Sequence, residues 1–427
     1  MISSFRASGL ARNVSWLGLR MVLLLVINLV VTRLLLDGFG TDVYGVWTTA
    51  VSVVALGSFI PNTVGDVTMR FLSMAHDAAQ ARIRFRVSVR VNMIASFLLM
   101  LMACGGLLWM RDYASLAPGM SRQEVSVLIG LVGTMMFFKF LCQPYFGLMF
   151  ARERFGMFAS FSIVEGIAML LCAYAARFMA DPLLGYAFMM AMAETGLLCA
   201  VVAVSRLTMK DIFAAPVSQL CNIAGEFTRF LGWVLLGGFA MTLWVEGATV
   251  CYNGLYGVEA SAVMGIAMLV LTRLRGVMSG IQKGVVPRIM SVYVSDREAA
   301  GRLTLHLMLW SVVVVGVGAL AGNAFMPRIL ELCLGTVPEG LTGVMKAVLV
   351  IIILESVSLP ASAAVQASGS VQSFELWESS ALLLMLPALY VAYIAGCSMV
   401  VTAWTFVAVD VIVTGIRLYF AVKAFAR

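Results

Sequence analysis

Long apolar segments separated by short polar turns follow one another along the whole chain. A helix that crosses the roughly 30 Å hydrocarbon core of a bilayer needs about 20 predominantly apolar residues, and twelve segments reach that length. The pattern therefore predicts an all-α polytopic membrane protein with twelve transmembrane helices. The predicted spans are residues 14–36, 46–69, 88–110, 125–149, 157–178, 183–204, 229–250, 261–287, 303–324, 342–362, 376–396 and 399–419.

Composition supports lipid as the main solvent of this chain. Hydrophobic residues make up 62% of the 427 residues and charged residues 12%, about half the ~25% charged share of soluble proteins. This balance excludes an ordinary cytosolic enzyme, a secreted disulfide scaffold and a disordered protein. The first segment is longer than the apolar core of a signal peptide and no A-x-A cleavage site follows it, so we expect it to remain as the first helix.

Few residues suggest bound groups or catalysis. The eight cysteines show no CxxC spacing and the two histidines lie far apart, so we predict no metal site and no cofactor. There is no GxxxxGK[ST] phosphate loop, which argues against ATP hydrolysis by this chain and against an enzyme. The net charge of +7 is not gathered on a soluble domain, so we expect no nucleic-acid partner.

Orientation follows from the positions of the basic residues. With the N-terminus inside, the cytoplasmic segments hold 18 Lys and Arg residues and the outer segments hold 4. Because basic residues accumulate on the cytoplasmic side, this bias predicts both termini in the cytoplasm. The loop sequence ASGSVQSFELWE carries no basic residue and departs from the rule.

The chain divides by pattern into two lobes of six helices. Residues 206–228 form the largest predicted stretch outside the membrane and are interpreted as a cytoplasmic linker between lobes 1–205 and 229–427. A shift of 217 residues reveals a faint repeat, which pairs Trp16 with Trp233, Leu19 with Leu236, Gly40 with Gly257 and Asp42 with Glu259. Parallel six-helix repeats are a transporter architecture, with the substrate site between the repeats.

Thirteen charged residues fall inside the predicted spans. A charge at the bilayer centre costs at least ~2.5–3.5 kcal/mol on insertion scales, so it usually faces the protein interior or a water-filled cavity. Seven of these residues are basic and six are acidic: Arg20, Arg33, Lys139, Arg273, Arg275, Lys283 and Lys346; Asp66, Glu165, Glu194, Glu246, Glu355 and Asp410.

The eighth span carries two central arginines. Arg273 and Arg275 point about 200° apart on a helix, so they cannot face one cavity without a distortion. We expect one to face a cavity, together with Lys283, and the other to pair with an acid; two structural ion pairs are the alternative. On the first span, where Asn28 lies between them, Arg20 and Arg33 either snorkel to the interface or line a cavity.

Lys139, Glu165 and Glu194 lie at similar depth in three successive spans. We expect them to contact one another, either as a static clamp or as a proton or cation relay, because two neighbouring carboxylates cannot easily both be ionised. Glu355 and Asp410 either do the same in the second half or neutralise an arginine of the eighth span. Pro61 is expected to kink the second span and to act as a hinge, because proline removes a helical hydrogen bond.

Two stretches resemble bacterial polysaccharide transporters. The opening stretch, WLGLRMVLLLVINLVVTRLLLDGFGTDVYGVWTTAVSVVALGSFIPNTVGDVTMRFLSMA, shares a first helix ending in a TRxL-type run, a turn with a glycine and YG, and a second helix closing on R-F after a GD element. GLMFARERFGMFASFSIVEGIAMLL resembles their junction between helices 4 and 5. The chain is similar to the oligosaccharide-lipid flippases of the multidrug/oligosaccharidyl-lipid/polysaccharide (MOP) superfamily.

This resemblance implies a V-shaped, MATE-like bundle of two lobes in the bacterial inner membrane, with helices 1, 2, 7 and 8 lining a central cavity. The implied substrate is an undecaprenyl-diphosphate-linked oligosaccharide, flipped by alternating access for surface polysaccharide assembly, with coupling to H⁺ or Na⁺ and with a polysaccharide polymerase and chain-length proteins as partners. The substrate-binding candidates are Arg20, Asn28, Arg33, Arg273, Arg275 and Lys283. The candidates for ion coupling or ion pairs within the lobes are Asp66, Lys139, Glu165, Glu194, Glu246, Glu355 and Asp410.

Three alternatives remain open at this point. A MATE-type cation-coupled drug antiporter is disfavoured by two arginines and no acid on the first span, although Glu165 and Glu194 keep it in play. A peptidoglycan-precursor flippase usually has fourteen spans. A membrane glycosyltransferase would need a large outer loop, and the outer loops near 111–124 and 325–341 are short.

Overall fold

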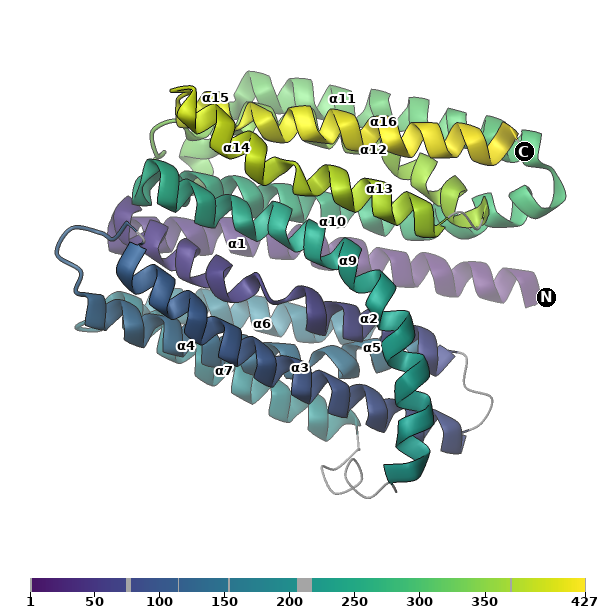
Figure 1. The fold of residues 1–427 in the computed structure, drawn as a ribbon, viewed down its shortest axis with the longest axis horizontal. Helices are drawn as coiled ribbons and strands as arrows, with labels where there is room; N and C mark the ends of the chain where they lie inside the picture. Colours follow the sequence, from purple (N-terminus) through teal and green to yellow (C-terminus); the bar gives the residue numbers. More distant parts are fainter. Residues whose placement is uncertain are drawn as a thin grey trace. The chain divides into compact units, whose positions relative to one another are not determined.

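The structure is a computed structural model, and it describes residues 2–73, 78–113, 115–152, 154–205, 217–368 and 371–426. All regular secondary structure in these ranges is helical (Figure 1). Each of the twelve predicted spans lies on one or two of these helices. The predicted all-α membrane fold is therefore confirmed, and within the described ranges nine helices are long and apolar enough to cross a bilayer.

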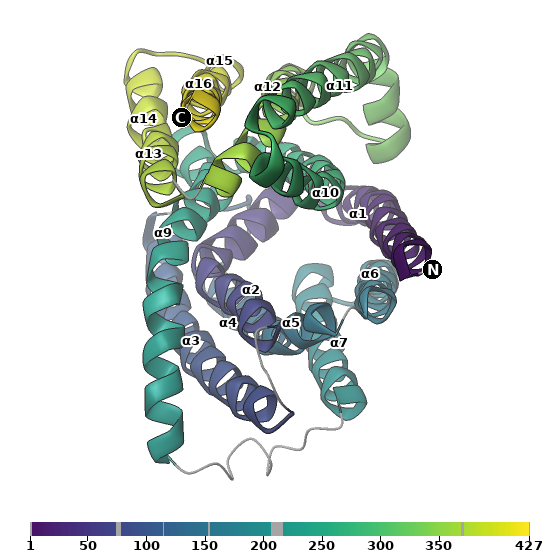
Figure 2. The same cartoon turned by 90° about the vertical axis from the view of Figure 1, so that its right-hand side faces the viewer.

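The chain divides into two compact units, Met1–Thr242 and Leu243–Arg427. Unit 1 contains the first part of α9 and the following helices: α1 (Ile2–Ala55), α2 (Phe59–Ser73), α3 (Ala78–Tyr113), α4 (Arg122–Leu141), α5 (Gln143–Ala151), α6 (Phe155–Ala176) and α7 (Pro182–Ser205). In this unit α1 packs beside α6 and α2 beside α5, and Figure 2 shows both pairs nearly end-on.

Unit 2 contains the rest of α9 (Val217–Tyr256) and all later elements. These are α10 (Val258–Ser295), α11 (Arg297–Leu334), α12 (Leu341–Ser368), α13 (Val371–Leu383), α14 (Met385–Ile394), the short α15 (Met399–Thr402) and α16 (Trp404–Ala426). The helix α12 packs against α10, α11 and α16, so it is the central helix of this unit.

The predicted linker differs from the structure in its second part. Residues 206–216 lie outside the described residues, and residues 217–228 form the first turns of α9 rather than a loop. The helix α9 runs from Val217 into the seventh predicted span without a break. Hydropathy alone does not distinguish such an extension of a helix from a loop. The division of the chain into lobes at 206–228 stays a prediction.

A break interrupts the second predicted span at residues 56–58, between α1 and α2. Pro61 lacks the backbone N–H that would bond to the carbonyl of Gly57, and this carbonyl instead accepts a weaker bond from the N–H of Ile60 at 3.4 Å. Pro61 itself lies in the first turn of α2, where its missing N–H costs little. The distortion expected at this proline is present, one turn before it.

Two glycines that the repeat pairs have nearly the same backbone conformation. Gly40, inside α1, has φ 81° and ψ 169°. Gly257, between α9 and α10, has φ 96° and ψ −179°. Side chains with a Cβ rarely adopt this region, so both positions favour glycine. The match agrees with the repeat at a shift of 217 residues, which pairs these two positions.

Candidate functional site

The first charged cluster lies inside unit 1 and joins three helices. Lys139 of α4 donates to Glu165 of α6, with 2.6 Å between Nζ and Oε1. The same Nζ lies 3.8 Å from Oε1 of Glu194 on α7, which is an ion-pair distance but too long for a hydrogen bond. The contact that the sequence predicts among these residues is therefore present.

Burial differs strongly within this cluster. The side chain of Glu194 is 1% exposed, whereas Lys139 is 39% and Glu165 26% exposed. An uncompensated buried carboxylate is costly, so Glu194 depends on the nearby ammonium group or on a bound proton. Within this cluster the single positive charge of the lysine faces two carboxylates.

The second cluster lies inside unit 2 and centres on Arg275 of α10. Its Nε donates to Oε2 of Glu355 on α12 at 2.7 Å, and its Nη2 contacts the other carboxylate oxygen. This two-pronged contact is the strong geometry of arginine with carboxylates. The guanidinium carbon also lies 4.2 Å from the ring centre of Trp244 on α9, a cation–π contact. Of the two arginines in the eighth predicted span, Arg275 is thus the one that pairs with an acid.

A further ion pair extends this cluster. Arg417 of α16 donates through Nε to Oε1 of Glu378 on α13 at 3.0 Å, and through Nη1 to the Ser358 hydroxyl at 2.9 Å. Asp410, 1% exposed on α16, lies within electrostatic range of both ion pairs. Glu375 of α13 lies within electrostatic range of Glu378 and Arg417 as well, so acids outnumber arginines in this cluster.

Sequence reasoning missed Glu378 and Arg417. Glu378 lies at the start of the eleventh predicted span, and Arg417 was assigned to the cytoplasmic side. The usable signal was the spacing of Asp410 and Arg417, because residues seven apart lie on nearly the same face of a helix. A buried acid on that face favours a base two turns further along.

The predicted substrate-binding residues of the first span have different surroundings. Arg20 is half-buried, with its guanidinium carbon 4.4 Å from the centre of the Phe158 ring. Asn28 is buried and donates to the carbonyl of Leu24 at 2.6 Å. Arg33 is 47% exposed and lies 3.6 Å from Asp37, one turn further on. The exposure of Arg33 fits the snorkelling alternative better than it fits a buried site.

The remaining candidates differ in exposure. Asp66 is exposed on α2, and Glu246 and Arg273 are half-buried on α9 and α10. Lys283 lies in α10, but its side chain is outside the described residues. Within the described ranges no group of three His, Cys, Asp or Glu residues is placed to hold a metal ion.

Comparisons with known proteins rest on the fold. No family model matches the sequence, and no curated protein sequence matches it. Among solved structures, the chain is similar to an inward-facing multidrug resistance MATE family transporter of the MOP superfamily, with 13% identity, a TM-score of 0.71, and coverage of 94% of this chain and 93% of that one.

Two further structures cover nearly the whole chain. A eukaryotic MATE transporter has 14% identity and a TM-score of 0.66, with 98% of this chain and 99% of the other covered. A MOP superfamily transporter from Pyrococcus furiosus, described as having a binding pocket of reverse polarity that suggests a different function, has 11% identity and a TM-score of 0.63, with 98% and 94% covered. At these identities the likeness shows a shared fold.

Proposed function

We propose that this protein, which has the fold of MOP superfamily transporters, is a flippase. It moves an undecaprenyl-diphosphate-linked oligosaccharide across the bacterial inner membrane by alternating access, with both termini in the cytoplasm. The observation that carries the proposal is the sign of the charge on two spans. The first span holds Arg20 and Arg33 and no acid, and the eighth holds Arg273, Arg275 and Lys283 and no acid.

Basic residues inside a membrane suit an anionic substrate. A diphosphate headgroup and a polar oligosaccharide do not cross hydrocarbon unaided, whereas guanidinium groups offer charge-assisted, two-pronged contacts to phosphate oxygens. Because Glu355 already holds Arg275, we propose Arg273 and Lys283 of α10, and separately Arg20 of α1, as the residues that contact phosphate. Arg275 then supports the site by fixing α10 against α12.

Ion coupling is assigned to the two buried clusters. In the Lys139 cluster one lysine contacts two carboxylates, and in the Arg275 cluster acids outnumber arginines. Uptake of one proton or Na⁺ by Glu194 or by Asp410 would reduce the negative charge buried in its cluster. The energy for flipping would then come from the ion gradient, and a polysaccharide polymerase and chain-length proteins would take over the product.

The second candidate is a cation-coupled antiporter of small molecules. The shared fold with MATE transporters and the contact of Lys139 with two carboxylates favour this alternative. The two functions differ in the charge of the substrate. An antiporter of cationic compounds would lose activity when acids are removed and would be indifferent to Arg20 and Arg273.

The deciding experiment uses a deletion of the gene in its host. Lipid-linked repeat units are assayed on each side of the membrane, and the strain is complemented with Arg273→Ala, Arg20→Ala and Arg273→Lys. We expect repeat units to accumulate on the inner side in the deletion and in both alanine variants, with a smaller defect for the lysine variant, which keeps the charge but loses the two-pronged contact.

Arg302→Ala is the matched control, because Arg302 is 63% exposed and pairs with Glu298 within α11. Each variant is checked for normal membrane level. If both alanine variants distributed repeat units across the membrane as the unsubstituted protein does, the assignment of the phosphate contact to these arginines would be rejected. Unchanged distribution of repeat units in the deletion strain would reject the flippase and favour the antiporter.

A further inference from the structure

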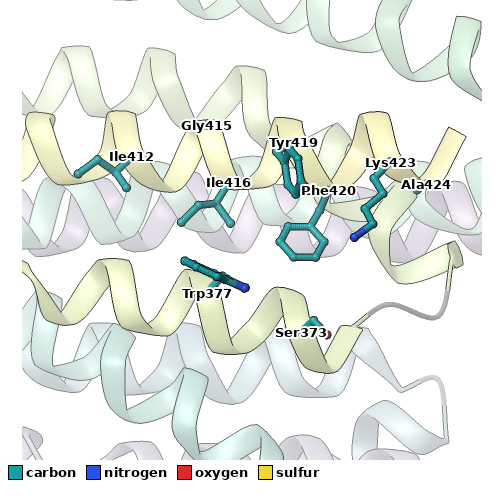
Figure 3. A pocket seen from close by; sticks show the side chains of 9 residues that line it. All are labelled: Ser373, Trp377, Ile412, Gly415, Ile416, Tyr419, Phe420, Lys423 and Ala424. Atoms are coloured by element: carbon teal, nitrogen blue, oxygen red, sulfur yellow. The ribbon is translucent and has the colours of Figure 1, made fainter. Parts of the chain in front are cut away.

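A pocket of about 750 Å³ lies between α13 and α16 in unit 2. None of the residues that line it belongs to the two charged clusters. Figure 3 shows its lining, with Ser373 and Lys423 at one end and Ile412 at the other. The lining residues are Ser373, Trp377, Ile412, Gly415, Ile416, Tyr419, Phe420, Lys423 and Ala424.

The middle of the pocket is apolar and lies between two membrane-spanning helices. The residues of α16 that line it recur every three or four positions, so they form one stripe along the helix. Gly415 keeps the pocket hollow, since a Cβ added there would meet nothing within 4 Å. Trp377 is 63% exposed and Tyr419 is 62% exposed. Ser373–Ile394 and Met399–Phe425 are both apolar enough to span a bilayer, so lipid hydrocarbon would surround a pocket at this depth.

The length of the pocket matches one leaflet. From Ile412 to Lys423 the chain advances about 16 Å along α16 at the helical rise of 1.5 Å per residue, and half of the ~30 Å hydrocarbon core is about 15 Å. Lys423 lies in the last turn of α16, which ends at Ala426. The charged end therefore lies where the headgroups of one leaflet would begin.

The polar end favours an anion. The Lys423 ammonium group lies 5.9 Å from the centre of the Tyr419 ring and 6.0 Å from that of Phe420. Among the described residues no carboxylate lies within ion-pair distance of Lys423. A phosphate placed there would gain a charge-assisted contact from Lys423, and the Ser373 hydroxyl at the same end offers a further donor.

We propose that this pocket binds one anionic glycerophospholipid, with an acyl chain along Trp377, Gly415 and Ile416 and the phosphate at Lys423. A second copy of the chain fits less well, because a partner helix would cover both leaflets and would not need a lone ammonium group at one end. Lys423 lies near the C-terminus, which we propose to be cytoplasmic, so the phosphate would lie in the cytoplasmic leaflet. This leaflet is the one rich in anionic lipids. The proposal does not depend on what the protein transports.

The test reconstitutes the full-length protein in phosphatidylcholine vesicles. The vesicles contain a small fraction of a probe lipid with a photoactivatable acyl chain, which is either phosphatidylglycerol or phosphatidylcholine. After irradiation, the labelled peptides are mapped by mass spectrometry. We expect phosphatidylglycerol to label the facing surfaces of α13 and α16 about five-fold more than phosphatidylcholine does, the gain that one basic residue gives at an anionic lipid surface. Lys423→Gln should remove this preference and leave labelling by phosphatidylcholine unchanged.

Gly415→Leu fills the pocket and should abolish labelling there by either lipid. Gly318→Leu on α11 is the matched control, because Gly318 also faces open space and should leave the pocket labelled. Melting temperatures establish that the variants fold. Equal labelling by both lipids, or full labelling of Gly415→Leu, would overturn the proposal. A disulfide-linked dimer formed by Tyr419→Cys in a cysteine-free background would overturn it too, since a second copy would then cover the pocket.

Discussion

The two units differ in backbone geometry at one point of their repeat. With the shift of 217 residues, the break at residues 56–58 of unit 1 corresponds to residues 273–275 of unit 2. Unit 1 interrupts its helix there, one turn before Pro61, whereas α10 of unit 2 continues unbroken and carries Arg273 and Arg275. At this point of the repeat the two units therefore differ both in helix geometry and in charge.

The buried clusters show a similar relation. A shift of 216 residues pairs Lys139 with Glu355 and Glu194 with Asp410. In each cluster acids outnumber bases, but the first depends on a half-exposed lysine and the second on an enclosed, two-pronged arginine pair. The comparison teaches that an excess of buried acids can be held loosely in one unit and tightly in the other. Four measurements test it.

The largest expected effect is on thiol labelling in intact cells, which is all-or-none. It tests whether the two halves have the same orientation in the membrane. Single cysteines at Met120 and Thr336, in a cysteine-free background, should both react with a membrane-impermeant thiol reagent in intact cells, because the basic-residue bias places both loops outside. Glu298→Cys, before α11, should react only after permeabilisation. Reaction of Met120→Cys and Thr336→Cys from opposite sides would break the comparison between parallel repeats.

The next largest effect is expected at the tight ion pair. Glu355→Ala leaves the guanidinium of Arg275 buried without its carboxylate, and removal of one partner of a buried pair costs about 3–5 kcal/mol. We expect a much lower melting temperature in detergent, and recovery of most of the loss in Arg275→Met/Glu355→Leu. Glu298→Ala, in the exposed pair with Arg302, serves as the control and should change stability by less than about 1 kcal/mol. A similar small loss for Glu355→Ala would show that the pair is dispensable.

An intermediate effect is expected at the paired glycines. Gly40→Ala and Gly257→Ala each force a Cβ into a backbone region that glycine alone adopts readily, at about 1–3 kcal/mol. The two losses in free energy of unfolding should be similar, since the conformations at the two positions are similar. Gly316→Ala inside α11, where a Cβ meets open space, should be neutral or stabilising. If only one of the two variants lost stability, the repeat would be a similarity of sequence that does not extend to backbone conformation.

The smallest effect is expected at the half-exposed lysine. Lys139→Met removes the positive charge that faces Glu165 and Glu194, but solvent reaches this lysine, so we expect about 1–2 kcal/mol of destabilisation. Thermal unfolding of Lys139→Met and of Lys139→Met/Glu165→Gln measures it, and the double variant should be the more stable. If Lys139→Met destabilised the protein as much as Glu355→Ala, the contrast between a loose and a tight cluster would fail.

Sequence alone determined the fold class and the presence of the charged contacts. Twelve apolar segments require helices, because every backbone polar group in lipid must bond within its own segment. The cost of a charge in lipid likewise required partners for Lys139, Glu165 and Glu194, and an acid for one arginine of α10. These predictions follow from local composition and depth, which the sequence carries directly.

Only the tertiary structure decided which partners meet. Helical spacing showed that Arg273 and Arg275 diverge, but the packing of α10 on α12 and α9 selected Arg275 for Glu355 and Trp244. The sequence pattern did not predict the pair of Arg417 with Glu378, because both residues lie near the ends of predicted spans. Contacts between distant helices depend on their rotation and register, and hydropathy fixes neither of these.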